Sequence, residues 1–147
     1  MALLIYTDGA CRGNPGPGGW AWFEPLSRAH DSGGELVTTN QRMELMAVLQ
    51  ALRSHAGDVL IRSDSTYVVN CFRQAWWKKW ESNGYRNSKG EPVANSDLWQ
   101  PLIDQVVRAG RRVTFEWVKG HSTDPNNNEV DLLAQEAARE LRQSGSG

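Results

Sequence analysis

Four carboxylates lie beside segments that have the pattern of a folded core. Asp8 and Asp64 each follow an apolar run, Glu44 lies inside an amphipathic segment, and Asp131 precedes a pair of leucines. A buried carboxylate without a partner costs several kcal/mol, so such acids are normally neutralised by a base, a proton or a cation. Few basic residues lie next to these four in the sequence. The pattern therefore indicates a metal site.

Each acid taken alone also has a simpler structural interpretation. Asp64 precedes Ser65 and could cap a following helix. Glu44 could be a helix-surface residue, and Asp131 could interact with the dipole at the start of a helix. The metal-site interpretation depends on the four acids occurring together.

Clustered carboxylates suit a hard cation and phosphodiester hydrolysis. Mg²⁺ prefers oxygen ligands and keeps several of its waters, whereas thiolate and imidazole cages suit other metals. Two such ions about 3.5–4 Å apart can activate a water, stabilise the leaving oxygen and neutralise charge on the phosphoryl group. We therefore expect two Mg²⁺ ions during catalysis, with Mn²⁺ as an alternative.

The elements that must position these acids follow from the hydrophobic pattern. Strands first in a meander, and then strands alternating with helices, predict an α/β fold in which helices cover a mixed sheet. The predicted strands are 3–7, 18–24, 32–38, 59–63 and 112–118, and the predicted helices begin at Asn40 or span 65–72, 75–81, 96–109 and 127–142. We expect one catalytic domain over 1–142 and a flexible tail over 143–147.

Composition narrows the setting. At 147 residues, with 22% charged and 39% hydrophobic residues, the chain has the size and composition of one globular domain. No apolar run approaches the ~20 residues that cross a bilayer, and the first residues lack the cationic flank of a signal peptide. We expect a cytoplasmic monomer without membrane contact or an obligatory protein partner, in which Cys11 and Cys71 are free thiols. The net charge of −1 requires any nucleic-acid surface to be local.

The motifs, in their order along the chain, resemble the bacterial type 1 ribonuclease H family. The shared segments are Tyr6-Thr7-Asp8-Gly9, the loop from Gly13 to Gly19, Thr38 to Leu45, Ser63-Asp64-Ser65, Trp117-Val118-Lys119-Gly120-His121 and Asp131. The resemblance implies a ribonuclease H-like fold with a five-stranded mixed sheet flanked by helices. It also implies a metal-dependent endonuclease that cuts the RNA strand of an RNA–DNA hybrid and leaves 5′-phosphate and 3′-hydroxyl ends.

The resemblance implies roles for particular residues. Asp8, Glu44, Asp64 and Asp131 would be catalytic metal ligands. His121 would assist proton transfer or product departure, because a loop histidine can carry protons near neutral pH; the alternative is a solvated loop residue.

Substrate contacts are implied in the same way. RNA differs from DNA by its 2′-hydroxyl, which is read in the wide minor groove. The residues implied to contact the two strands across that groove are Gly9, Cys11, Asn14, Asn40 and Gln41. Thr39 and Asn95 would hold a DNA phosphate, and Trp76 and Trp80, within a stretch that interleaves tryptophans and lysines, would lie along the DNA strand. Asn14 could instead be only a turn residue and Asn40 only a helix cap, and one tryptophan among 76, 77 and 80 could be core.

The sequence departs from the family pattern at three positions. Val37 stands where relatives often have an arginine near the phosphate site, Glu81 stands in a commonly basic run, and Asn128 takes the place of a frequent glutamate. These changes bear on affinity and salt dependence, since every catalytic acid is present.

Two rival functions remain open. One is a resolvase- or exonuclease-like nuclease of the same fold that acts on DNA, which would not need polar residues at the minor groove. The other is a non-catalytic hybrid-binding module, although clustered acids would not help a surface to bind phosphates.

Overall fold

The computed structural model describes residues 2–120 and 123–145. Its centre is a five-stranded sheet with the order β3-β2-β1-β4-β5. The strands are β1 (Leu3–Cys11), β2 (Gly16–Glu24), β3 (Ala29–Thr38), β4 (Val59–Ser63) and β5 (Val113–Trp117). The first three form an antiparallel meander, and β4 and β5 run parallel to β1. The predicted mixed sheet is confirmed.

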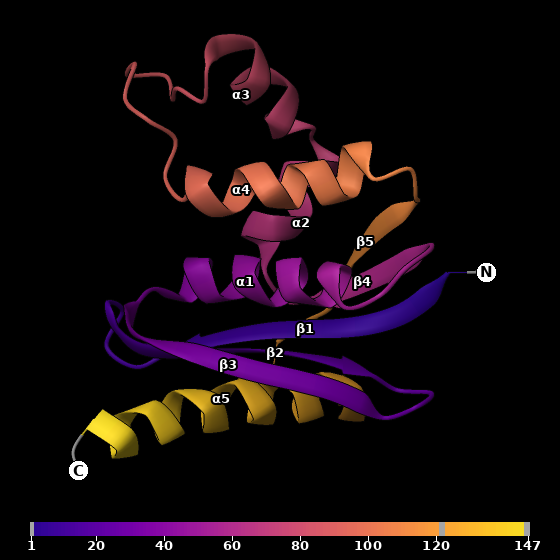
Figure 1. Cartoon of the computed structure of the whole chain (residues 1–147), viewed down its shortest axis with the longest axis vertical. Coiled ribbons are helices and arrows are strands. Elements are labelled where there is room, and N and C mark those ends of the chain that lie inside the picture. Colours follow the sequence, from indigo (N-terminus) through magenta and orange to yellow (C-terminus); the bar gives the residue numbers. More distant parts are fainter. Residues whose placement is uncertain (1, 121–122, 146–147) are drawn as a thin grey trace.

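Helices cover both faces of the sheet (Figure 1). The helices are α1 (Asn40–Arg53), α2 (Thr66–Arg73), α3 (Trp76–Asn83), α4 (Ser96–Ile103), a π-helix η1 (Asp104–Arg108) and α5 (Pro125–Gly145). The helix α5 packs against β1, β2 and β3 on one face, while α1 packs on the other face with α4 beyond it. No helix within residues 2–120 and 123–145 is long and apolar enough to cross a membrane.

The first half of the central strand β1, from Leu3 to Tyr6, is apolar because both of its faces are covered. Ile5 belongs to the larger core under α1, whereas Tyr6 belongs to a second core with Phe23, Val130 and Ala134 under α5. Successive side chains of a strand point to opposite faces, so a continuous apolar run can serve both cores. Asp8 therefore lies within a strand whose neighbouring side chains are packed on both faces of the sheet.

Every predicted helix and strand is present, with shifted bounds. Most of the predicted glycine and proline loop is strand, because β1 continues to Cys11 and β2 begins at Gly16. The helix predicted over 96–109 ends at Ile103 and continues as the π-helix η1. The last helix begins at Pro125 and reaches Gly145, past its predicted end at 142. The boundary between domain and tail stays a prediction.

Candidate active site

Three of the predicted acids converge on one point. Asp8, Glu44 and Asp64 each offer a carboxylate oxygen, and these oxygens lie within 4.8 Å of one another. Asp8 comes from β1, Glu44 from α1, and Asp64 follows the end of β4. Because β1 and β4 are parallel neighbours, Asp8 and Asp64 lie toward the same end of these two strands.

Asp131 completes the group from the opposite side of the sheet. It lines the same cavity of about 460 Å³ as the other three acids, and its carboxyl contacts that of Asp8. Asn127 and Gln135 line the cavity one turn before and one turn after Asp131 on α5. Gln135 Nε2 donates a hydrogen bond of 3.5 Å to Asp131 Oδ1. All four predicted acids therefore lie in one cavity.

The charges of this cluster are strongly perturbed. Asp8 is only 3% exposed, and its burial, the charges of Glu44 and Asp64, and its contact with Asp131 raise its pKa to about 11. Burial and the charge of Asp64 raise the pKa of Glu44 to about 8. Carboxylates this close cannot all ionise without a counter-charge. The cluster therefore holds protons near neutral pH unless a cation replaces them.

Two unsatisfied oxygens indicate that a cation with its waters fits the cavity. Glu44 Oε2 and Asn127 Oδ1 are buried, and neither has a hydrogen-bond partner among the described residues. Both residues line the cavity, and Asn127 is only 2% exposed. A buried oxygen left without a partner is costly, and both atoms are hard ligands of the type that Mg²⁺ and its waters accept. The residues present fit a divalent cation.

Asp64 is not a helix cap. The N-cap of α2 is Ser65, whose Oγ accepts from the backbone N–H of Val68 at 3.3 Å. The backbone carbonyl of Asp64 accepts from Trp117 Nε1 at 3.1 Å, which ties it to the end of β5. This leaves the carboxylate of Asp64 to face the cluster. The capping interpretation of Asp64 is therefore not needed.

The predicted proton-transfer residue His121 lies outside the described residues, so its role stays a prediction. The adjacent Gly120 is described, and a Cβ on it would lie 2.9 Å from Asp64 Oδ2. The segment after β5 therefore passes directly beside the carboxylate cluster.

The predicted minor-groove residues lie around the same cavity. Gly9, Cys11, Asn40 and Gln41 line it together with the acids. Asn14 lies outside the lining, but its Oδ1 accepts a 3.0 Å hydrogen bond from the backbone N–H of Asn40. The two cysteines are free thiols, as expected, and Cys11 Sγ donates to the carbonyl of Thr38 at 3.3 Å.

The first turn of α1 and the start of α4 meet at Arg42. Thr39 is the N-cap of α1, and its Oγ1 accepts from the backbone N–H of Arg42 at 3.2 Å, so Asn40 is not the cap. Arg42 Nη1 donates to Asn95 Oδ1 at 3.3 Å, and its guanidinium forms a two-point ion pair with Asp97 at 3.0 and 2.8 Å. Thr39 and Asn95, which are far apart in the sequence, are thereby joined through Arg42.

The tryptophans of α3 are partly buried against the core and partly exposed. Trp76, Trp77 and Trp80 are all half-buried and pack against the main core, so the core alternative holds in part for each of them and completely for none. Trp80 packs on Trp99 with ring centroids 5.3 Å apart, and Trp76 packs on Tyr67 at 6.4 Å. The exposed parts of these rings remain accessible to a ligand. Their buried parts attach α3 to the body of the protein.

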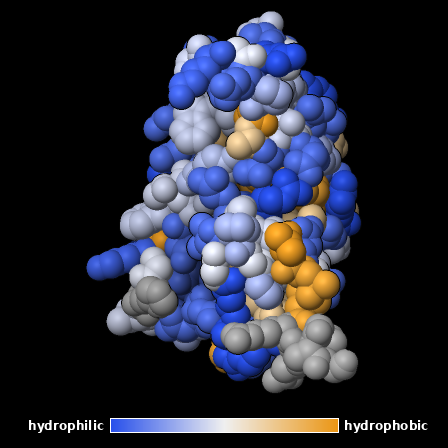
Figure 2. All heavy atoms as spheres, turned by 90° about the vertical axis from the view of Figure 1, so that its left-hand side faces the viewer, coloured by the Kyte–Doolittle hydropathy of each residue, from blue (hydrophilic) through white to orange (hydrophobic). Residues whose placement is uncertain are grey.

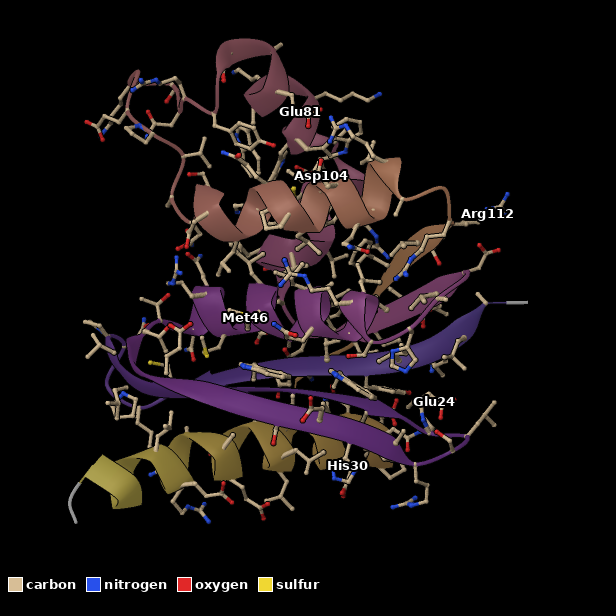
Figure 3. The ribbon with its side chains drawn as sticks, viewed as in Figure 1. Glu24, His30, Met46, Glu81, Asp104 and Arg112 are labelled. Atoms are coloured by element: carbon tan, nitrogen blue, oxygen red, sulfur yellow. The ribbon has the colours of Figure 1, made fainter. Side chains whose placement is uncertain are left out.

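Glu81 has a structural role in the same region. Arg108 in η1 pairs with Glu81 of α3 and, at 2.6 Å, with Asp104. Figure 3 labels the two acids, Glu81 and Asp104. The acid therefore joins α3 to η1. It also neutralises a cation that would otherwise add to the positive field of this region.

Three residues of the site were not identified from the sequence. Asn127 and Gln135 flank Asp131 at helical spacing, which could have indicated them once Asp131 was assigned to a helix. Arg42 could be assigned only to the polar face of its helix. Its contact with Asn95 depends on the packing of α1 near α4.

Comparison with known proteins decides the family. The RNase H family model matches residues 1–139. The chain belongs to the RNase H family. A ribonuclease H of Syntrophomonas wolfei is 47% identical over 146 residues, covering 95% of this chain and 97% of that relative. A ribonuclease H of Moorella thermoacetica is 48% identical over 144 residues, covering 95% and 93%.

A solved structure agrees with this RNase H assignment. LC9-RNase H1, described as a type 1 RNase H with the type 2 active-site motif, superposes with a TM-score of 0.76 at 29% identity, covering 95% of this chain and 74% of that one. The predicted family, the predicted fold and the predicted class of enzyme, a ribonuclease H, are confirmed.

Proposed function

We propose that this RNase H is a metal-dependent endonuclease that hydrolyses the RNA strand of an RNA–DNA hybrid and leaves 5′-phosphate and 3′-hydroxyl ends. The observation that carries the proposal is the convergence of carboxylate oxygens from Asp8, Glu44 and Asp64 within 4.8 Å, in a cavity that Asp131 also lines. A surface that only bound the phosphates of a nucleic acid would be weakened by such clustered negative charge.

Each of the four acids would have its own role in holding the metal ions. Asp8 and Asp64 would flank both metal positions, Glu44 would hold one ion and lie toward the 2′-hydroxyl of the substrate, and Asp131 would complete the second position. Two Mg²⁺ ions, or Mn²⁺ in their place, would lower the pKa of the attacking water and stabilise the leaving oxygen. The raised pKa values of Asp8 and Glu44 support a cluster built to receive positive charge.

The polar residues beside the acids distinguish the RNA strand. Asn40 and Gln41 are exposed at the start of α1 and line the cavity, and their amides can both donate and accept hydrogen bonds at a 2′-hydroxyl. Asn14 fixes the backbone of Asn40 from the β1–β2 connection. Gly9 and Cys11 line the cavity at the end of β1, where a side chain larger than Cys11 would reduce the space for the substrate.

The DNA strand is held farther from the acids. Thr39 and Asn95, joined by Arg42, would contact a DNA phosphate, and Trp76 and Trp80 would stack along the same strand. The face on which β3 ends and α1 begins is mostly hydrophilic, with an apolar patch low on the right in Figure 2. His121 would transfer protons at the cleavage step.

One chain brings the four acids together in one cavity, and we extend the proposal to a monomer that needs no obligatory protein partner. We extend the proposal to the cytoplasm as its place of action.

The test compares substrates of one sequence. RNA–DNA, RNA–RNA and DNA–DNA duplexes are incubated with Mg²⁺, and with chelator, using the wild type and Asp8→Asn. We expect cutting of only the RNA strand of the hybrid, only with metal, and none by the variant, which should still bind the hybrid. Cutting of DNA would favour a resolvase- or exonuclease-like nuclease. Tight hybrid binding without cleavage by the wild type would favour a binding module.

A further inference from the structure

Tyr6 is a buried tyrosine whose hydroxyl joins the sheet to the start of α5. The residue is 1% exposed and its ring packs in the core under α5, with Phe23, Val130 and Ala134. Its hydroxyl lies 2.6 Å from Asp124 Oδ2 and 2.9 Å from Arg62 Nη1. A phenylalanine would fill this core equally well, so the hydroxyl has a separate reason to be there.

The direction of the two hydrogen bonds is fixed by chemistry. A guanidinium can only donate, so the hydroxyl of Tyr6 accepts from Arg62 and donates its own proton to Asp124. Arg62 is itself held, because its Nε donates to Glu116 Oε1 at 2.9 Å. The chain of contacts thus runs from β5 through β4 and β1 to the residue before α5.

Asp124 transmits this attachment to the helix. Its Oδ1 accepts from the backbone N–H of Asn126 at 2.9 Å, and its carbonyl accepts from the backbone N–H of Asn128 at 3.1 Å. Burial raises the pKa of Asp124, but hydrogen bonds from Tyr6 and from the first amides of α5 outweigh burial and lower it overall. The carboxylate therefore stays ionised and caps the helix with one oxygen while it binds Tyr6 with the other.

The position of this cap determines the position of the metal-binding face. Asp131 follows Asp124 by seven residues, or about two helical turns, so it lies on nearly the same side of α5. Asn127, whose buried Oδ1 has no partner among the described residues, lies between them. A shift of the helix start would move both residues relative to Asp8 on the neighbouring strand.

Apolar packing holds α5 close to the sheet, but it is less directional than the hydrogen bonds of Asp124. The helix approaches β2 so closely that a Cβ on Gly19 would lie 2.2 Å from the carbonyl oxygen of Ala134. The contact surface of α5 there is made of small alanines, Ala134, Ala137 and Ala138. Apolar contacts are non-directional, whereas a short hydrogen bond between charged and polar groups has a defined geometry.

We infer that Tyr6 is a positioning residue of the metal site: through Asp124 it fixes the start of α5, and so sets how strongly the Asp131 side of the cavity holds its cation. The inference rests on the proposed function, since it needs Asp131 to be a metal ligand. The hydrogen bonds among Tyr6, Arg62 and Asp124 would thus affect metal binding by positioning α5, without touching the metal or the substrate.

The test replaces Tyr6 by phenylalanine in the full chain, which removes one oxygen and keeps the ring. The Mg²⁺ or Mn²⁺ concentration for half-maximal cleavage should rise about 10-fold, the size of effect of losing a residue that orients a metal ligand. The KM for the hybrid should stay within about twofold, because the contacts of the substrate residues are unchanged. The rise in Tm on adding Mg²⁺ or Mn²⁺ should also need a higher metal concentration.

Matched variants separate positioning from simple destabilisation. Arg111→Ala removes hydrogen bonds from Arg111 to the carbonyls of Leu52 and His55 at the other end of α1, and it should lower Tm without changing the metal requirement. Asp124→Ala should repeat the effect of Tyr6→Phe, and the double variant should be no worse than either single variant. Asp124→Ala also supplies the measurement if Tyr6→Phe does not fold.

Two results would overturn the inference. One is a Tyr6→Phe protein with a lower Tm and an unchanged metal requirement, and the other is an additive effect in the double variant. Failure of the proposed function has a different signature, because the wild type itself would then show neither metal-dependent cleavage nor a metal-dependent Tm. The metal dependence of Tm tests the positioning role without reference to cleavage.

Discussion

Gly9 and Glu44 are in direct contact through their backbones. A Cβ on Gly9 would lie 2.5 Å from the backbone nitrogen of Glu44, far closer than two such atoms can approach. The missing side chain lets the first turn of α1 lie against β1, which brings the carboxylate of Glu44 to that of Asp8. Gly9 therefore has a structural reason to be glycine in addition to its proposed place beside the substrate.

Gly9→Ala should lower activity more than stability alone explains. Forcing α1 away from β1 should cost about 1–3 kcal/mol of folding free energy, as overpacking does. It should also lower kcat by about 10-fold or more, because a shift of about 1 Å in a catalytic group can cost 100-fold. Stability is measured by chemical denaturation and kcat with saturating hybrid and metal.

The matched control for Gly9→Ala is Gly34→Ala. A Cβ there would lie 2.4 Å from the carbonyl oxygen of Gly18, but Gly34 does not line the cavity. It should destabilise the fold by a similar amount while folded molecules keep their kcat. Equal losses of kcat in the two variants would show that Gly9 has no special relation to Glu44.

Asp8→Asn should stabilise the metal-free protein at neutral and alkaline pH. Burial and the charges of Glu44 and Asp64 raise the folded-state pKa of Asp8 above its value of 3.8 in a model compound. The folded state therefore retains a proton that the unfolded chain loses, and stability is highest below the unfolded pKa and falls as pH rises toward the folded pKa. Asparagine removes this loss.

We expect a gain of about 1–3 kcal/mol for Asp8→Asn at pH 8 in chelator, the scale of a buried group without a partner, and little gain at pH 4. Urea denaturation at the two pH values measures it. Asp97→Asn is a control that should change stability in the opposite direction, because the hydrogen bond and charge of Arg42 lower the pKa of Asp97. Losing the Asp97 carboxylate should cost under about 1 kcal/mol of folding free energy near neutral pH. An Asp8→Asn protein that is no more stable than the wild type at pH 8 would contradict the unfavourable ionisation of Asp8 in the cluster.

Metal binding should release protons and should become tighter as pH rises. A carboxylate binds a cation only after it loses its proton, and the pKa values of Glu44 and Asp8 are raised to about 8 and about 11 in the metal-free protein. The apparent affinity for Mg²⁺ should therefore increase from pH 6 to pH 8. Calorimetry in buffers of different ionisation enthalpy counts the protons, and identical heats in all buffers would refute the prediction.

The part of the fold set by local pattern was predictable from the sequence. Apolar runs before Asp8 and Asp64 marked β1 and β4, and the periodicity around Glu44 marked α1. Turn chemistry was less reliable: the strand was predicted to begin at 18, but Gly16 and Pro17 already belong to β2. The glycine at 19 falls within the predicted strand, and it allows α5 to approach. The close contact, rather than a turn, explains that glycine.

The hydrophobic pattern of the sequence could not predict contacts between residues that are far apart in the chain. Tyr6 and Asp124 are 118 positions apart, and Arg42 and Asn95 are 53 apart. Each of these residues has an ordinary local role, as a strand, loop or helix residue, and only the packing of α5 and α4 pairs them. The acids were identifiable because each one lies beside a core segment and all four occur in the order of a family pattern. Asn127 also lines the cavity, but no sequence motif marked it.

Val37→Arg should strengthen hybrid binding through the DNA strand. Val37 is 76% exposed and lies two residues before Thr39, the cap of α1 that Arg42 links to Asn95. An arginine there would add a cation beside the proposed phosphate contact, while the carboxylate cluster stays unchanged. We expect a lower KM at low salt, an unchanged kcat, and a salt dependence of log KM steeper by about one unit of slope, as for one added phosphate contact.

The matched control for Val37→Arg is Leu26→Arg, which adds the same charge at a residue that is 90% exposed and remote in sequence from the cavity lining. A rise in slope for Leu26→Arg as large as that for Val37→Arg would mean that net charge, rather than a phosphate contact near Thr39 and Asn95, controls binding.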